Sequence, residues 1–165
     1  MRQTRTKITV VRPFESAYYA ANLRALRRLA MQQELANVLL FAWSEVEYFV
    51  DTLVLWDFLA REVKIFRQNS DDARTPILTE LPFWRKVSFL RKRDIITRKE
   101  VLTVQTFQKA RNRMFHRRGK DVLNVMFIGE ESSKIMSNSI ATVQALYSAT
   151  RRYIWKKRLR ITYER

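Results

Sequence analysis

The scarcity of glycine and proline is the feature that most constrains the fold of this chain. Glycine occurs twice and proline three times in 165 residues, and neither occurs between residues 15 and 67. A β-sandwich or β-barrel needs turn residues at intervals of roughly 8–12 residues, and this sequence does not supply them. Apolar residues recur at helical spacing instead. The sequence therefore predicts an all-α protein.

We expect a single helical domain over residues 1–165, built as an up-and-down bundle of about five helices. The stretch without glycine and proline is too long for one ordinary helix, so we divide it into two near residues 31–33. Further helices are expected at residues 82–92, 98–117 and 131–158.

The segments between and beyond these helices are less regular. Residues 68–76 are polar and end in proline, which predicts a loop. Residues 121–128 are compatible with a short helix or with a strand. Residues 8–11 and 159–163 contain β-branched or alternating residues, so a short β ribbon formed by the two termini is an alternative to irregular ends.

The charge balance of the chain points to an anionic partner. Lys and Arg number 32 and Asp and Glu number 16, which gives a formal net charge of +16. A surplus of this size is typical of proteins that bind a phosphate backbone, a membrane surface or an acidic protein. Nucleic acid is the favoured partner, and a merely solvated charged surface is the weaker alternative.

The composition also excludes several kinds of site. The chain has no cysteine and one histidine, so a disulfide framework is excluded and a zinc site within one chain is disfavoured. No apolar run approaches the roughly 18 residues of a membrane-spanning helix. We therefore expect a cytoplasmic protein that needs no metal or cofactor and does not enter a membrane.

The single histidine, His116, lies in a very basic segment. Imidazole is the side chain best suited to proton transfer near pH 7. Asn112 is four residues earlier and shares a helix face with His116, and Arg111 can converge with them if the helix ends before Gly119. The neighbouring cations are candidates for binding the phosphates of a nucleic acid: Lys109, Arg113, Arg117, Arg118 and Lys120.

The run Arg111-Asn112-x-x-x-His116 resembles the signature of the HEPN superfamily. In that signature an arginine and a histidine are separated by four to six residues, often with a polar residue such as Asn after the arginine. The preceding apolar and basic segment, residues 83–107, fits the same pattern. The resemblance covers roughly residues 40–155.

The resemblance implies a metal-independent endoribonuclease that acts as a homodimer, with both motifs at the interface, in a defence or toxin-like role. The 2′-hydroxyl of a single-stranded RNA would attack its own phosphate and leave a cyclic phosphate end. His116 would transfer protons, Arg111 would bind the phosphate and the transition-state charge, and Asn112 would orient His116 or the RNA. One histidine cannot easily be both base and acid, and two-fold symmetry would supply a second.

One position departs from the pattern of a HEPN subgroup. In the toxins that are paired with small nucleotidyltransferases, a tyrosine usually lies two residues after the histidine and is modified by the partner. Arg118 occupies that position here, so control by that modification is doubtful. An antitoxin or regulatory partner of another kind stays open.

The end of the last predicted helix forms a second basic region. Tyr153, Trp155 and Tyr163 alternate there with cations, as in proteins that stack single-stranded RNA bases on aromatic rings. Alternatively, the cations offset the helix dipole and the aromatic rings belong to the core. The cations counted as candidate RNA ligands are Arg151, Arg152, Lys156 and Lys157.

Two further questions stay open in the sequence. Glu45, Glu47, Asp51 and Asp57 could bind Mg²⁺ or supply another catalytic group, but such a set is more often the solvated face of a core helix. The protein could also be a non-catalytic RNA- or DNA-binding subunit, which would bind in a salt-dependent way and form no product. An interaction module for an acidic protein or a membrane surface is a third possibility.

Overall fold

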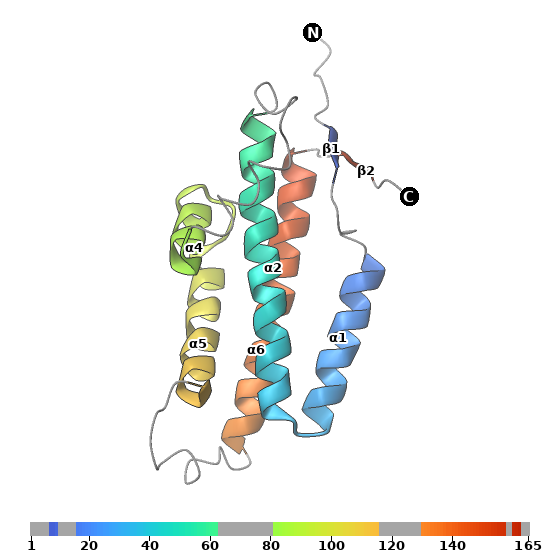
Figure 1. Cartoon of the computed structure of the whole chain (residues 1–165), viewed down its shortest axis with the longest axis vertical. Coiled ribbons are helices and arrows are strands. Elements are labelled where there is room, and N and C mark those ends of the chain that lie inside the picture. Colours follow the sequence, from blue (N-terminus) through green and yellow to red (C-terminus); the bar gives the residue numbers. More distant parts are fainter. Residues whose placement is uncertain (1–6, 10–15, 63–80, 116–129, 158–159, 163–165) are drawn as a thin grey trace.

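Helices make up almost all of the structure. The computed structural model describes residues 7–9, 16–62, 81–115, 130–157 and 160–162. Five α-helices lie within these ranges, so the predicted all-α class is confirmed (Figure 1). The helices are α1 (Ser16–Met31), α2 (Leu35–Glu62), α4 (Phe83–Lys92), α5 (Arg98–Phe115) and α6 (Glu130–Lys157).

Two short strands lie near the ends of the chain. β1 (Lys7–Thr9) and β2 (Arg160–Thr162) pair in parallel, with Ile8 opposite Ile161. Two strands of three residues each are marginal on their own, so they contribute little independent stability. The other residues of the predicted ribbon lie outside the described residues, as do the predicted loop at 68–76 and the segment 121–128.

The break between α1 and α2 confirms the division predicted near residues 31–33. Gln33 has φ 56°, in the left-handed region. Its N–H donates to Ala30 O at 3.1 Å, and the N–H of Glu34 donates to Leu29 O at 3.0 Å, which are the two bonds of a Schellman motif. Glycine usually takes the left-handed position, because a Cβ atom costs about 1–2 kcal/mol there. The packing of α1 against α2 therefore has to offset this cost.

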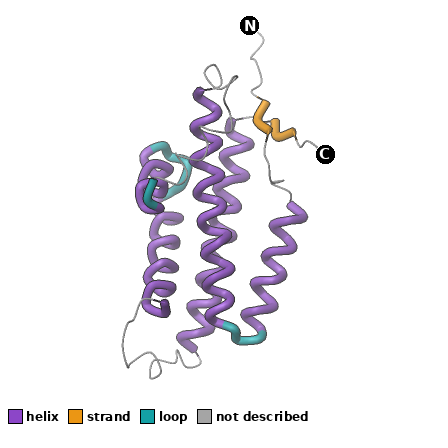
Figure 2. The backbone as a smooth tube through the Cα atoms, viewed as in Figure 1, coloured by secondary structure: helices purple, strands orange, loops and turns teal. Residues whose placement is uncertain are grey.

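The hydrophobic core is centred on the two longest helices, α2 and α6. α1 packs on one side of this pair, and α4 and α5 lie on the other side (Figure 1). Figure 2 shows the short described loops between consecutive helices, and the loop between α4 and α5 contributes Ile95 and Ile96 to the core. Large side chains that are almost completely buried come from all five helices, among them Leu26 of α1, Trp56 of α2, Leu90 of α4, Phe107 of α5 and Leu146 of α6.

Buried hydroxyl groups on α6 form hydrogen bonds within their own helix. Ser139 and Thr150 are completely buried. Ser139 Oγ donates to Ile135 O at 2.7 Å, and Thr150 Oγ1 donates to Leu146 O at 2.8 Å. A buried hydroxyl without a partner would cost about 1–3 kcal/mol. These bonds therefore allow small polar residues to face the core, where they let neighbouring helices approach closely.

The corner between α4 and α5 is built by two local motifs. Asp94 has φ 53° and ends α4 in a second Schellman motif, in which Ile95 N–H donates to Leu90 O at 3.0 Å. α5 then begins with a capping box: Thr97 N–H donates to Glu100 Oε2 at 2.7 Å, and Glu100 N–H donates to Thr97 Oγ1 at 3.2 Å. The reciprocal bonds fix the direction in which α5 leaves the corner.

Candidate nucleic-acid interface

α5 and α6 run antiparallel, and an ion pair marks each end of their contact. At one end Arg113 of α5 faces Glu131 near the start of α6, with Nη1 3.4 Å from Oε1. At the other end Glu100 near the start of α5 accepts from Arg152 near the end of α6 at 2.8 Å. Residues 131 and 152 are separated by roughly 30 Å along a helix. The two basic regions predicted from the sequence therefore lie at opposite ends of the bundle.

The Arg111 guanidinium is held by aromatic rings and by its neighbour in the chain. Its Cζ lies 4.7 Å from the centroid of the Trp43 ring of α2 and 6.0 Å from that of Phe115. These distances are within the range of cation–π attraction. Arg111 Nη1 also donates to Asn112 Oδ1 at 3.1 Å. Arg111 is half-buried, so these contacts give it a defined orientation at the end of α5.

Trp43 is itself fixed by other aromatic side chains. Its ring centroid lies 4.7 Å from that of Phe83 at the start of α4 and 6.1 Å from that of Phe107 on α5. Phe107 is almost completely buried. Trp43 therefore connects the core to the Arg111 guanidinium, and the position of Arg111 depends on three helices.

Arg111 keeps part of its hydrogen-bonding capacity unused. Its Nε is buried and has no hydrogen-bond acceptor among the described residues. A buried donor without an acceptor costs about 1–3 kcal/mol, and a guanidinium can satisfy its N–H groups only with acceptors from elsewhere. Phosphate and carboxylate oxygens are the acceptors that fit its planar fork best. Because Nε is enclosed, an anionic ligand would contact the terminal nitrogens of the guanidinium.

The rest of the predicted catalytic motif is only partly visible. Asn112 lies beside Arg111 and accepts a hydrogen bond from it, a contact that was not predicted from the sequence. His116 directly follows the last described residue of α5 and lies outside the described residues. The same holds for the predicted phosphate ligands Arg117, Arg118 and Lys120 and for the predicted helix end at Gly119.

The other described cations near Arg111 are at the surface. Lys109 and Arg113 are exposed and are four residues apart on α5, so they share a face of the helix. Arg113 is paired with Glu131, but both side chains are about half exposed, and such pairs contribute about 0–1 kcal/mol. Both cations therefore lie where they can contact a polyanion that approaches the end of α5.

The basic end of α6 separates into a core part and a surface part. Tyr153 is buried, and its hydroxyl donates to Asp57 Oδ1 at 3.0 Å, so it belongs to the core and cannot stack on a base. Trp155 is 84% exposed. The interpretation of interleaved stacking rings is therefore wrong for Tyr153, because its hydroxyl bonds a buried carboxylate, and it remains open for Trp155. Tyr163 lies outside the described residues.

The cations of this region have different surroundings. Arg152 is bound to Glu100, and Arg151 Cζ lies 5.9 Å from the centroid of the Tyr147 ring. Lys156 is exposed. The side chain of Lys157 lies outside the described residues. Two of the predicted RNA ligands, Arg151 and Arg152, are therefore engaged in contacts within the protein.

The carboxylates of α2 form neither a metal cluster nor one solvated face. Glu45 and Asp57 are buried, whereas Glu47 is exposed. No group of three or more acidic or histidine side chains in the described ranges could hold a metal ion. The prediction of a solvated face is therefore wrong for the buried pair, because carboxylates of α2 bond other helices. Asn22 donates to Glu45 at 2.9 Å, Lys86 donates to Asp51 at 2.8 Å and Tyr153 donates to Asp57 at 3.0 Å.

Two residues important for these sites were not identified from the sequence. Trp43 is one apolar position among many on α2, and no local signal indicates that it supports Arg111. Glu100 could have been found, because Thr97 and Glu100 have the spacing of a capping box before an apolar-periodic segment. The contact of Glu100 with Arg152 depends on the helix packing and has no local signal.

Comparisons of this chain with known protein families, curated proteins and solved structures found no similar protein. In the described ranges, none of the helices is long and apolar enough to cross a lipid bilayer. The function is therefore inferred from the residues of the site and from their contacts.

Proposed function

We propose that this protein is a metal-independent endoribonuclease that cuts single-stranded RNA. The observation that carries the proposal is the geometry of Arg111: its guanidinium is packed 4.7 Å from the Trp43 ring and hydrogen-bonded to Asn112. A guanidinium oriented in advance is suited to the phosphoryl oxygens of RNA. The net charge of +16 supports attraction of a polyanion.

The proposed reaction is an internal transesterification. The 2′-hydroxyl oxygen forms a bond to the adjacent phosphorus, the bond from phosphorus to the 5′-oxygen breaks, and a 2′,3′-cyclic phosphate remains. His116 takes the proton from the hydroxyl or returns one to the leaving oxygen. Arg111 neutralises the charge that develops on the phosphorane, and Asn112 keeps its guanidinium oriented.

The proposal includes a homodimer with a defence or toxin-like role. Two-fold symmetry brings a second His116 to the site, so that one imidazole serves as base and the other as acid. An antitoxin or regulatory partner restrains the activity. The fold assigned to this enzyme is an up-and-down, HEPN-like bundle with the β1–β2 ribbon at one end, and the antiparallel ion pairs between α5 and α6 support that topology.

The test compares the wild type with three single variants on end-labelled single-stranded RNA in EDTA. We expect cleavage that leaves cyclic phosphate ends, and a decrease in rate of about 100-fold or more for Arg111→Ala and for His116→Ala. Arg24→Ala is the matched control, because Arg24 is an exposed arginine of α1 that belongs to neither candidate site. It should retain the rate within about threefold.

A different result would favour the alternative function. If the wild type binds RNA with a strong dependence on salt but forms no product, the protein is a non-catalytic RNA-binding subunit. The observation that favours this alternative is the exposed Trp155 beside Arg152 and Lys156. In that case Arg111→Ala and Arg113→Ala should weaken RNA binding to a similar extent, because each removes one phosphate contact.

A further inference from the structure

A cavity lies at the opposite end of α5 from Arg111. Its volume is about 510 Å³, within the range of small-molecule sites. Residues of the α4–α5 corner, α2 and the end of α6 line it, including Arg93, Ile95, Tyr153, Trp155 and Lys156. The cavity also borders Thr97, which is roughly 21 Å from Arg111 along the helix axis. It is therefore separate from the candidate catalytic site.

One side of the cavity is an exposed indole. Trp155 is 84% exposed, although tryptophan usually buries most of its large surface. Ile95 and Tyr153 are more than nine-tenths buried and provide an apolar wall in the same cavity. A planar ring that enters the cavity can therefore cover the indole and remove apolar surface from water.

Two acidic side chains line the cavity, Asp57 and Asp94, and both are paired with arginines; Arg91 Nη1 lies 2.7 Å from Asp94 Oδ1. Asp57 is almost completely buried and accepts a hydrogen bond from Tyr153 at 3.0 Å. Arg93 Nε lies 3.4 Å from Asp57 Oδ2, which is close enough for charge pairing but is not a well-formed hydrogen bond. The negative charge of the Asp57 carboxylate is therefore already balanced by Arg93 within the protein.

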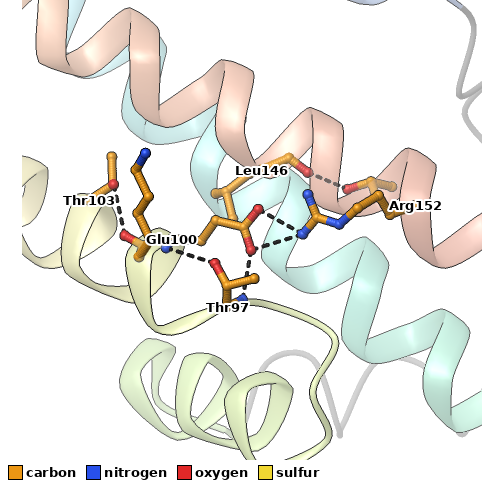
Figure 3. Close-up of polar contacts among 7 residues, drawn as sticks. Thr97, Glu100, Thr103, Leu146 and Arg152 are labelled. Carbon is orange, nitrogen blue, oxygen red and sulfur yellow. Dashed lines mark hydrogen bonds and ion pairs between the residues drawn. The ribbon is translucent and has the colours of Figure 1, made fainter.

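Arg152 is fixed at the edge of the cavity by the capping box of α5. Its Nη2 contacts both carboxylate oxygens of Glu100, at 2.8 and 3.0 Å, and Glu100 also accepts from Thr97 N–H at 2.7 Å (Figure 3). The Arg152 side chain is nevertheless 52% exposed. The carboxylate contacts involve one of its terminal nitrogens, so the guanidinium is oriented but still accessible to a ligand.

A second cation lies on the same face of α6. Lys156 is four residues after Arg152, and Trp155 is three residues after it, so all three share a helix face. Lys156 is exposed and has no acidic partner in the part of the chain that the structure describes. Two accessible cations therefore lie within about one helical turn of an accessible aromatic ring.

We propose that this cavity binds one unpaired nucleotide, whose base stacks on Trp155 and whose phosphate contacts Arg152 and Lys156. Stacking and phosphate contacts together recognise a nucleotide without reading its base, because every base has a flat π face. The ligand is either a free mononucleotide or one nucleotide of a single-stranded RNA. This inference does not depend on the ribonuclease proposal, since it uses none of Arg111, Asn112 and His116.

The test is a calorimetric titration of the full-length protein with AMP and, separately, with a short oligoadenylate. We expect saturable binding, and an affinity about tenfold or more lower for Trp155→Ala. Trp155→Phe should retain most of the affinity, and Lys156→Ala should lose several-fold. Lys134→Ala, which removes an exposed lysine near the other end of α6, is the matched control and should bind like the wild type. Circular dichroism of each variant verifies folding.

The two ligands distinguish the sources of the nucleotide. Similar affinities per site for AMP and the oligomer assign the cavity to free nucleotides, and a much tighter oligomer assigns it to RNA. The inference is overturned if neither ligand binds, if Trp155→Ala binds like Lys134→Ala, or if inorganic phosphate competes as well as AMP does. His116→Ala should still bind AMP, so a failure of the ribonuclease proposal and a failure of this one give different results.

Discussion

An arginine lies at each end of α5, Arg152 of α6 at its start and Arg111 at its end, and the two have different partners. At the start of the helix Arg152 contacts both oxygens of the buried Glu100 carboxylate, which also caps the helix. At the end of the helix Arg111 rests on the Trp43 ring, and its Nε has no acceptor among the described residues. The first arrangement completes a charge pair within the fold, and the second orients a cation without supplying its anion.

The comparison of Arg152 with Arg111 shows how the partner of an arginine decides between a structural role and ligand binding. A carboxylate partner lowers the local positive potential, so a phosphate that approaches Arg152 gains less than one that approaches an uncompensated guanidinium. An aromatic ring holds the cation without cancelling its charge. Arg111 should therefore contribute little to stability, whereas the Glu100–Arg152 pair should stabilise the fold while it also orients Arg152 at the cavity. Three substitutions test this division, and they are ordered by their expected effect on the free energy of unfolding.

Glu100→Ala should have the largest effect. It removes a cap of α5 and the buried partner of Arg152, so the free energy of unfolding should fall by about 2 kcal/mol. Urea denaturation followed by circular dichroism measures this change. Glu100→Gln keeps an acceptor for Thr97 N–H but removes the charge, and should cost about half as much. An unfolding midpoint for Glu100→Ala equal to that of the wild type would show that this end of α5 is not stabilised by the pair.

Arg111→Ala should have a smaller effect on stability. The lost cation–π contact is worth about 0.5–1 kcal/mol at a partly exposed site, and removal of the buried donor offsets part of that loss. The same urea experiment measures it, and Trp43→Leu tests whether the ring is what positions the guanidinium. If Arg111→Ala destabilised the protein more than Glu100→Ala does, Arg111 would be a structural residue and the contrast between the two ends would disappear.

Arg113→Ala should have the smallest effect. Its ion pair with Glu131 spans 3.4 Å between two half-exposed side chains, and exposed pairs contribute at most about 0.5–1 kcal/mol. We expect a change in the free energy of unfolding below about 0.5 kcal/mol, which 0.5 M salt abolishes. A double-mutant cycle with Glu131→Gln measures the coupling. Coupling above about 1 kcal/mol would mean that this ion pair fixes the antiparallel contact of α5 and α6.

Much of the fold follows from local features of the sequence. The scarcity of glycine and proline and the helical period of apolar residues predict an all-α protein, and the predicted starts of α4 and α6 lie within one residue of those observed. The division near Gln33 was also predicted from the length of the stretch. These features are local, because helix formation depends on hydrogen bonds and side-chain contacts within a few residues.

The site could be predicted only in part. The sequence alone determined that the chain is helical and strongly basic, and it placed Arg111 and Asn112 near the end of a helix. Only the tertiary structure decided that Trp43 supports Arg111, that Asp57 is buried against Tyr153 and that the two basic regions lie at opposite ends of the bundle. Periodicity shows which face of a helix is apolar, but the residue that packs opposite is set by contacts between segments distant in the chain.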